Sequence, residues 1–128
     1  MKKDSQQFVL DLIAQTIYDK KGFNILGLDI TKISSLTQYL IIAEGNVDRH
    51  VQSLGNAVID ELKKKGIRPY RVEGRAGGDW IVIDFVDIMV HLFMPGLREK
   101  YALEKLWQEG EIVDLAIDID EEEKKIGM

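Results

Sequence analysis

Two segments in the second half of the chain, residues 79–85 and 87–93, limit most strongly the folds that this sequence can adopt. Both are rich in isoleucine, valine and aromatic residues, which favour β-strands. A single residue separates the two segments, and so short a connection can join only antiparallel neighbours. We therefore expect a β-hairpin, and with it a fold that contains a sheet.

The register of this hairpin decides which side chains share a face of the sheet. We place a two-residue turn at residues 85–86, which makes Ile81 the partner of Val90. The same register pairs Ile83 with Ile88, so one face is aliphatic, and we expect this face to pack under helices. The opposite face carries the other side chains of the two strands, namely Trp80, Val82, Asp84, Asp87, Met89, His91 and Phe93.

This aromatic face has two interpretations. It can be a second core layer, because the sheets of α/β proteins are often covered on both sides. It can instead bind a partner, because Trp, Met and Phe are enriched at the centres of interfaces and Trp is a frequent hot spot. The sequence leaves open whether Trp80 belongs to the core or to an interface.

Apolar residues at helical spacing predict helices on both sides of a buried strand. Residues 39–43 are almost continuously apolar, as expected of a strand that is buried on both faces. A helix after Gly45 and Asn46 has a stripe of Val47, Val51, Leu54, Val58 and Leu62, and it ends near Gly66. An earlier helix, capped by Asp4 or Ser5, has a stripe of Phe8, Val9, Leu12, Ile13, Thr16 and Ile17.

The remaining patterns complete the fold prediction. Strands are predicted at residues 24–30 and 69–74, and a last helix is predicted at residues 97–108. We therefore predict one α/β domain over residues 1–110, with helices packed on a mixed sheet of about five strands. The tail, residues 111–128, is acidic but has enough aliphatic residues to dock in part.

The charge distribution limits the classes of function. The net charge is −5, and all of it belongs to residues 111–128, so residues 1–110 are electrically balanced. A balanced domain does not suit an indiscriminate nucleic-acid binder, which needs many phosphate contacts by Lys and Arg. The chain has no cysteine and no apolar run of the roughly 20 residues that span a membrane. We expect a cytoplasmic protein without disulfides or membrane contact.

Three constellations could carry chemistry or bind phosphate. Asp79, Asp84, Asp87 and His91 could hold a metal ion, although Asp beside a turn commonly bonds the nearby backbone instead. The glycine-rich residues 73–78 lack the Gly-Lys-Ser/Thr of a phosphate loop and lead into a strand. A basic run comprises Lys63, Lys64, Lys65, Arg68, Arg71 and Arg75, and it is either a solvated helix end or a peripheral contact for RNA phosphates.

The two histidines form no metal motif. His50 follows Arg49 in the first turn of the predicted second helix. A protonated His is disfavoured near a helix N-terminus, so we expect a neutral His50 that makes hydrogen bonds. We predict no metal, no cofactor and no catalytic residue.

Several motifs, taken in order and spacing, resemble those of the ribosomal silencing factor family, also called the Iojap-like family. They are Asp29, the strand at 39–43, Arg49-His50, Glu73-Gly74, the Trp80 strand at 79–84, the Asp-x-x-x-His strand at 87–91 and the helix at 98–107 with Tyr101, Leu103 and Trp107. The resemblance covers roughly residues 6–108. This chain departs from the family at Val47-Asp48, where Ser or Thr is common before the Arg-His, and at Val86, where Gly is usual.

The resemblance implies a fold related to nucleotidyltransferases but without their catalytic signature. It also implies binding to the large ribosomal subunit through ribosomal protein L-fourteen, which blocks the joining of the small subunit and represses translation when nutrients are short. The candidate partner-binding residues are Trp80, Ile81, Asp84, Met89, His91, Tyr101 and Trp107. We expect a monomer or a weak homodimer. The alternatives are a metal-dependent nucleotidyltransferase-like enzyme and a large-subunit assembly factor that contacts ribosomal RNA.

Overall fold

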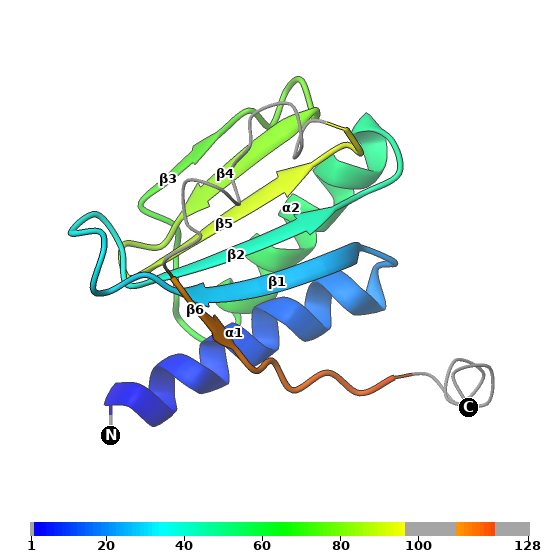
Figure 1. Cartoon of the computed structure of the whole chain (residues 1–128). Coiled ribbons are helices and arrows are strands. Elements are labelled where there is room, and N and C mark those ends of the chain that lie inside the picture. The colour runs from blue at the N-terminus through cyan, green and yellow to red at the C-terminus, as the bar shows by residue number, and fades with distance from the viewer. Residues whose placement is uncertain (1, 97–109, 120–128) are drawn as a thin grey trace.

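The computed structural model describes residues 2–96 and 110–119 and gives the side chains from Ser5 onward within them. These residues form two helices and six strands, which Figure 1 labels. The elements are α1 (Lys2–Asp19), β1 (Phe23–Asp29), β2 (Tyr39–Glu44), α2 (Asp48–Lys63), β3 (Arg71–Glu73), β4 (Trp80–Asp84), β5 (Ile88–Phe93) and β6 (Glu111–Val113). The helix predicted at residues 97–108 lies outside the described residues.

The six strands form one mixed sheet with the order β3-β4-β5-β2-β1-β6. β2 and β5 pair in parallel, and the other neighbours pair antiparallel. The predicted α/β fold with a mixed sheet is confirmed. The sheet has one strand more than expected, because β6 comes from the acidic tail and adds to the edge of β1.

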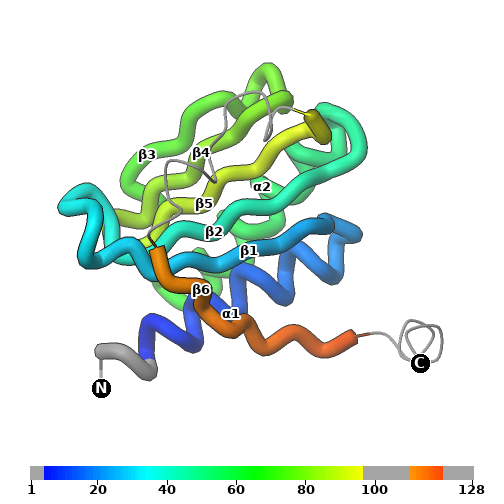
Figure 2. Tube along the Cα trace, in the orientation of Figure 1, coloured from blue at the N-terminus to red at the C-terminus, as the bar shows by residue number. Residues whose placement is uncertain are grey.

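Both described helices pack on the same face of the sheet, as Figures 1 and 2 show. In α2, the predicted stripe is confirmed at four positions, since Val51, Leu54, Val58 and Leu62 are fully buried. Val47 does not belong to this stripe. It is the N-cap residue of α2, its side chain makes no capping hydrogen bond, and it is 52% exposed.

The stripe predicted for α1 is confirmed in part, since Ile13, Thr16 and Ile17 are buried. Leu10, Ile13, Ala14 and Ile17 are at most 1% exposed, and their spacing of three and four residues places them on one side of the helix. Phe8, which the prediction placed in the stripe, is 56% exposed. Within the described residues, neither helix combines the length and the apolarity that crossing a membrane requires.

β2 lies in the middle of the sheet and is buried on both faces, as its apolar run predicted. Ile41 and Ala43 belong to the core between the sheet and the helices. Leu40 and Ile42 belong to a second apolar cluster on the opposite face. All four side chains are at most 1% exposed, which explains why this strand does not show the usual alternation of apolar and polar residues.

The register predicted for the β4–β5 hairpin is wrong by two residues. Ile81 pairs with Leu92 and Ile83 pairs with Val90, so the central turn residues are Val86 and Asp87. The partners change, but a shift of two residues leaves every side chain on its predicted face. The aliphatic face therefore packs under the helices, as expected.

The hairpin turn is held by an aspartate side chain and not by a glycine. Oδ1 of Asp84 accepts a hydrogen bond from the Val86 N–H at 2.8 Å, and the Phe85 N–H donates to the Ile88 carbonyl at 2.9 Å. Val86 has a φ of 78°, a region that a β-branched residue adopts only with strain. Its side chain is 56% exposed, so little packing compensates for this strain.

We expect Val86→Gly to raise the free energy of unfolding by about 1 kcal/mol. Glycine adopts a positive φ without strain, and this gain exceeds the entropy that glycine adds to the unfolded chain. Val86→Ala is the matched control, because it removes the exposed methyl groups but keeps the Cβ that causes the strain. Urea unfolding of the three proteins checks the prediction, and equal midpoints for all of them would contradict it.

Candidate functional site

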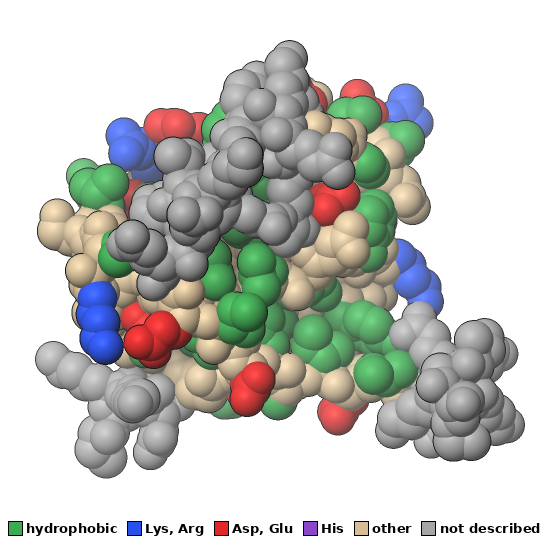
Figure 3. Space-filling view, viewed as in Figure 1, with side chains coloured by type: hydrophobic (Ala, Val, Ile, Leu, Met, Phe, Trp, Pro, Cys, Tyr) green, Lys and Arg blue, Asp and Glu red, His purple; other side chains and the backbone are tan. Residues whose placement is uncertain are grey.

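The sheet face turned away from α1 and α2, here called the distal face, carries its own apolar cluster. Its members come mainly from β1, β2, β4 and β5 and are Leu26, Leu28, Ile30, Leu40, Ile42, Trp80, Met89 and Phe93. Figure 3 views this face and shows hydrophobic side chains gathered over the middle of the sheet. The residues of this cluster on the hairpin were predicted from the sequence, but those on β1 and β2 were not. Alternate apolar residues at positions 26, 28 and 30 were the available signal.

An aromatic corner lies at one end of this cluster. Trp80 pairs with Phe93 across the strands, and their ring centroids are 5.4 Å apart at an angle of 39°. The rings of His91 and Phe93, two residues apart on β5, are stacked with centroids 6.0 Å apart. The Trp80 Nε1–H donates a hydrogen bond to Nδ1 of His91 at 3.1 Å.

Because of these contacts, Trp80 is packed on one side and exposed on the other. One part of the indole packs on the aromatic corner and satisfies its N–H there. The side chain is nevertheless only partly buried, whereas Phe93 beside it is fully buried. Trp80 is therefore anchored by the core and still offers surface at the edge of the distal face.

His91 is an uncharged hydrogen-bond acceptor at neutral pH. Burial lowers the pKa of His91 from 6.5 to about 4, since the low-dielectric surroundings disfavour the imidazolium. Its Nδ1 accepts from the indole of Trp80, which requires that nitrogen to be unprotonated. The aromatic corner thus presents no positive charge at neutral pH, and His91 is poorly suited to act there as a general acid.

Asp84 and Met89 lie beside each other at the other end of the hairpin. They are direct partners across β4 and β5 and line a small hollow together with Arg71, Glu73 and Val82. Nε of Arg71 is 3.5 Å from a carboxylate oxygen of Glu73. The margin of the distal face is therefore polar and carries charges of both signs.

Of the remaining candidate residues, the structure describes only Ile81. Ile81 faces the helices and is fully buried, so its side chain is not available to a partner. The resemblance assigned Trp80, Ile81 and Asp84 of one strand to the contact, but only alternate residues of a strand face the same side. Tyr101 and Trp107 lie outside the described residues.

The structure gives no support to the metal site considered for Asp79, Asp84, Asp87 and His91. Across residues 2–96 and 110–119, no three His, Cys, Asp or Glu side chains come together in a way that could hold a metal ion. Asp84 holds the turn through the Val86 N–H, as Asp residues commonly do.

His50 has a structural role in a neutral form. Its Nδ1 lies 2.8 Å from the Asn46 N–H, which can only donate, and its Nε2 lies 2.7 Å from the Lys20 carbonyl, which can only accept. These two partners require a proton on Nε2 and none on Nδ1. The ring thereby joins the start of α2 to the residue after α1, which agrees with the hydrogen-bonding role that was predicted.

The glycine-rich loop is tied to α2 through its carbonyl groups. Nε2 of Gln52 donates to the carbonyls of Arg75 and Ala76, at 2.9 and 3.0 Å. The loop returns on itself through the Gly78 N–H and the Gly74 carbonyl, and both glycines have positive φ. These hydrogen bonds fix the conformation of the loop and its position against α2.

The side chains of the basic run are exposed, and several are used within the chain. Lys64 pairs with Glu61 at 2.7 Å, and Arg75 donates to Asn56 at 2.8 Å. Lys65 lies over the ring of Phe8, with Nζ 5.8 Å from its centroid. These contacts favour a solvated helix end, and the peripheral RNA contact stays a prediction.

We expect acid to destabilise the fold through His91. The unfolded chain takes up a proton near pH 6.5, whereas folded His91 does so only near pH 4. Unfolding therefore becomes easier as the pH falls through this window, and the difference stays constant below it. His91→Gln keeps an acceptor for Trp80 and should reduce the loss of stability between pH 7 and 4.5 by about 2–3 kcal/mol. Urea unfolding at both pH values checks this, and an equal loss in both proteins would contradict it.

Comparison with known proteins identifies the family. The model of the family described as "ribosomal silencing factor during starvation" (RsfS) matches residues 2–127, and so extends over the acidic tail, beyond the 6–108 of the sequence resemblance. A ribosomal silencing factor of Chromobacterium violaceum is 37% identical over 101 residues, 79% of this chain and 83% of that protein. One of Bacillus subtilis is 34% identical over 111 residues, 87% of this chain and 94% of that protein.

A more distant relative and a solved structure extend the comparison. The mouse protein named "Mitochondrial assembly of ribosomal large subunit protein 1" is 29% identical over 104 residues, 79% of this chain and 46% of that protein. A crystal structure of a Chromobacterium violaceum protein superposes with a TM-score of 0.78 at 34% identity, covering 90% of this chain and 95% of that one. The chain belongs to the ribosomal silencing factor family.

Proposed function

We propose that this protein binds the large ribosomal subunit, prevents the small subunit from joining it and so represses translation when nutrients are limiting. The observation that carries the proposal is the family match over residues 2–127. Blocking a subunit by occupying its surface needs no catalysis, so a site without acid–base or metal chemistry is sufficient. The proposed partner on the subunit is ribosomal protein L-fourteen.

The distal face is the proposed contact surface. Interfaces typically combine an apolar, aromatic centre with a polar rim, and Trp is a frequent hot spot. The aromatic corner at Trp80 and the polar margin at Asp84 follow this pattern. An uncharged His91 supports the same proposal, because an imidazolium at the centre of an interface would cost desolvation energy.

Trp80 is the proposed anchor of this contact, with Met89 beside the same cluster. The aromatic corner fixes the indole before binding, which reduces the entropy that is lost when a partner closes over it. A specific interface of standard size buries about 1,600 Å² in total, so the contact must extend beyond Trp80 to the margin of the face.

The large-subunit assembly role is the second candidate function. It is favoured by the mouse relative, whose name states this role. The exposed basic run would then supply contacts to ribosomal RNA, and binding would weaken steeply with salt. Sedimentation profiles of cells that lack the protein separate the candidates, since assembly precursors accumulate only if the protein acts in assembly.

We expect Trp80→Ala to weaken binding to purified large subunits by about 30-fold or more, the equivalent of a 2 kcal/mol hot spot. The partly buried indole should cost less stability than the roughly 3–5 kcal/mol of a fully buried one. Co-sedimentation measures the binding, and a melting curve establishes that the variant is folded. Phe8→Ala is the matched control, because Phe8 is an exposed aromatic residue on α1, on the other side of the sheet. Undiminished co-sedimentation of Trp80→Ala would contradict the proposed surface.

Asp84→Asn tests the charge at the margin of the distal face. The amide oxygen of Asn can still accept the Val86 N–H, so we expect stability to change by less than about 1 kcal/mol. If the carboxylate pairs with a cation of the partner, subunit binding should fall about tenfold and depend less on salt. Co-sedimentation at two salt concentrations measures both effects. Unchanged affinity at low salt would exclude Asp84 from the contact.

A further inference from the structure

The acidic tail continues beyond β6 along α1. Residues 111–119, here called the strap, first pair with β1 and then follow the helix, as the orange segment in Figures 1 and 2 shows. Burial alternates along the strap, with Val113, Leu115 and Ile117 partly buried and the residues between them exposed. This alternation is that of an extended peptide lying on a surface.

A row of polar side chains on α1 holds the main chain of the strap. The row, here called the ladder, consists of Gln7, Asp11 and Gln15, each four residues after the last. The contacts all reach backbone atoms: Gln7 Nε2 donates to the Asp114 carbonyl at 2.9 Å, the Ala116 N–H donates to Asp11 Oδ1 at 3.0 Å, and the Asp118 N–H donates to Gln15 Oε1 at 2.6 Å.

The ladder can bind the strap at regular intervals because the spacing of its residues along the helix matches the spacing of alternate residues along an extended chain. Four residues of α-helix rise about 6 Å, and two residues of extended chain advance about 6.6 Å. Three successive rungs can therefore meet every second residue of the strap. Within the ladder, Gln7 also donates to Asp11 at 2.9 Å, which orients the carboxylate. The rungs bind only the main chain, so they set the position and direction of a peptide whatever its outward side chains are.

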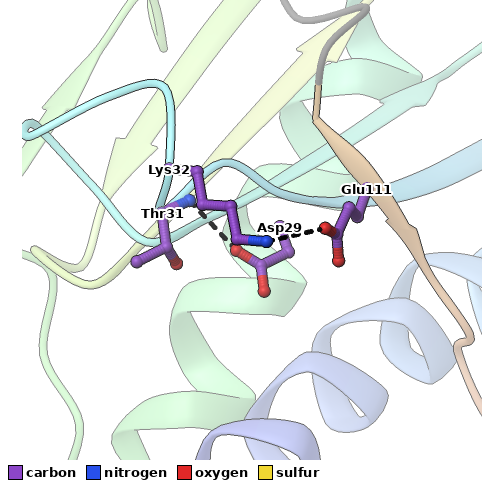
Figure 4. A network of polar contacts seen from close by, with 4 residues as sticks. All are labelled: Asp29, Thr31, Lys32 and Glu111. Carbon is purple, nitrogen blue, oxygen red and sulfur yellow. Dashed lines mark hydrogen bonds and ion pairs between the residues drawn. The ribbon is translucent and has the colours of Figure 1, made fainter.

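β1 forms the other half of the surface that binds the strap. Gly27 pairs with Val113, and a Cβ at Gly27 would lie 3.2 Å from the side chain of Leu115, so the glycine makes room for this residue. Asp29 lies opposite Glu111, and Lys32 reaches Glu111 with its Nζ at 3.4 Å (Figure 4). Val113, Leu115 and Ile117 are the partly buried residues of the strap, whereas Ile112 is 75% exposed and the acidic side chains face the solvent or Lys32.

The strap is attached by a short strand and by exposed hydrogen bonds. β6 is a three-residue edge strand, and the ladder bonds to the strap are exposed to water. Short, exposed edge elements belong to the least stable part of a fold and open without global unfolding. An open strap would leave the edge of β1 unpaired, and an unpaired edge accepts an extended segment from another chain.

We propose that β1 and the ladder of α1 form a binding site for an extended peptide with aliphatic residues at alternate positions. Its ligand is the strap, bound within its own chain in the monomer and exchangeable with the strap of a second copy. The strap is covalently joined to its own site, which favours the closed monomer, so exchange grows with protein concentration. The site lies on α1 and the edge of β1, and its operation requires no ribosome.

A synthetic peptide of residues 110–119 with a fluorescent label tests the site on the full chain. Leu115→Asp weakens the protein's own strap and leaves β1 and the ladder intact, so we expect this variant to bind the peptide at least tenfold more tightly than the wild type does. Adding Gln7→Ala and Gln15→Ala to the variant should reverse this gain. Fluorescence anisotropy measures the binding, and a peptide that itself carries Leu115→Asp is the control. Equal binding by wild type and Leu115→Asp, or no effect of the ladder substitutions, would overturn the proposal.

Crosslinking tests the exchange between copies, since the chain has no cysteine of its own. Directly paired residues on antiparallel strands lie within reach of a disulfide, so we use Asp29→Cys in one chain and Glu111→Cys in another. Oxidation of the mixture should give a covalent heterodimer whose yield rises with concentration and exceeds, at least fivefold, that of a control pair. The control combines Asp29→Cys with Ser53→Cys, an exposed position on α2. Equal yields from the two pairs would overturn exchange, while the peptide experiment tests the site separately.

Discussion

The parallel pairing of β2 with β5 is the contact on which both layers of this protein depend. It joins the antiparallel strands β6, β1 and β2 to the antiparallel strands β3, β4 and β5. Parallel strands need a long crossover, and α2 lies in the connection and packs its apolar stripe on the sheet. Because Ile41 pairs with Val90 and Ile42 pairs with His91, the same pairing aligns the core on one face and the aromatic corner on the other.

Periodicity in the sequence predicted the faces of the sheet better than the details of its turns. The hairpin partners were wrong by two residues, yet each side chain kept its face because the period of a strand is two. The position of the turn depends on the bond between Asp84 and the Val86 N–H, which holds a β-branched residue at a positive φ. No apolar pattern contains that information.

The candidate site was predictable where it depends on one hairpin and not where it depends on distant segments. Trp80, Met89 and His91 were placed on one face by alternation alone, and the structure brings them together with Phe93. The contribution of β1 and β2 required the strand order, which a single sequence does not specify. Partial docking of the tail was predicted from its aliphatic residues, but its position was not, since its partners on α1 are polar residues that look like an ordinary solvent-facing side of a helix.

The acidic composition of the tail and its docking are compatible because the ladder binds main-chain atoms. Asp114 and Asp118 lie at exposed positions of the strap, so their carboxylates stay in water while their main-chain atoms are bound by α1. The partly buried positions carry aliphatic residues, among them Val113 and Leu115, which pack against the core beside β1. In the proposed function we expect the exposed acidic residues of the strap to oppose loose attachment to ribosomal RNA, because its phosphates repel them. In the proposed function this leaves the uncharged aromatic corner of the distal face, and not the general charge of the protein, to decide where it binds.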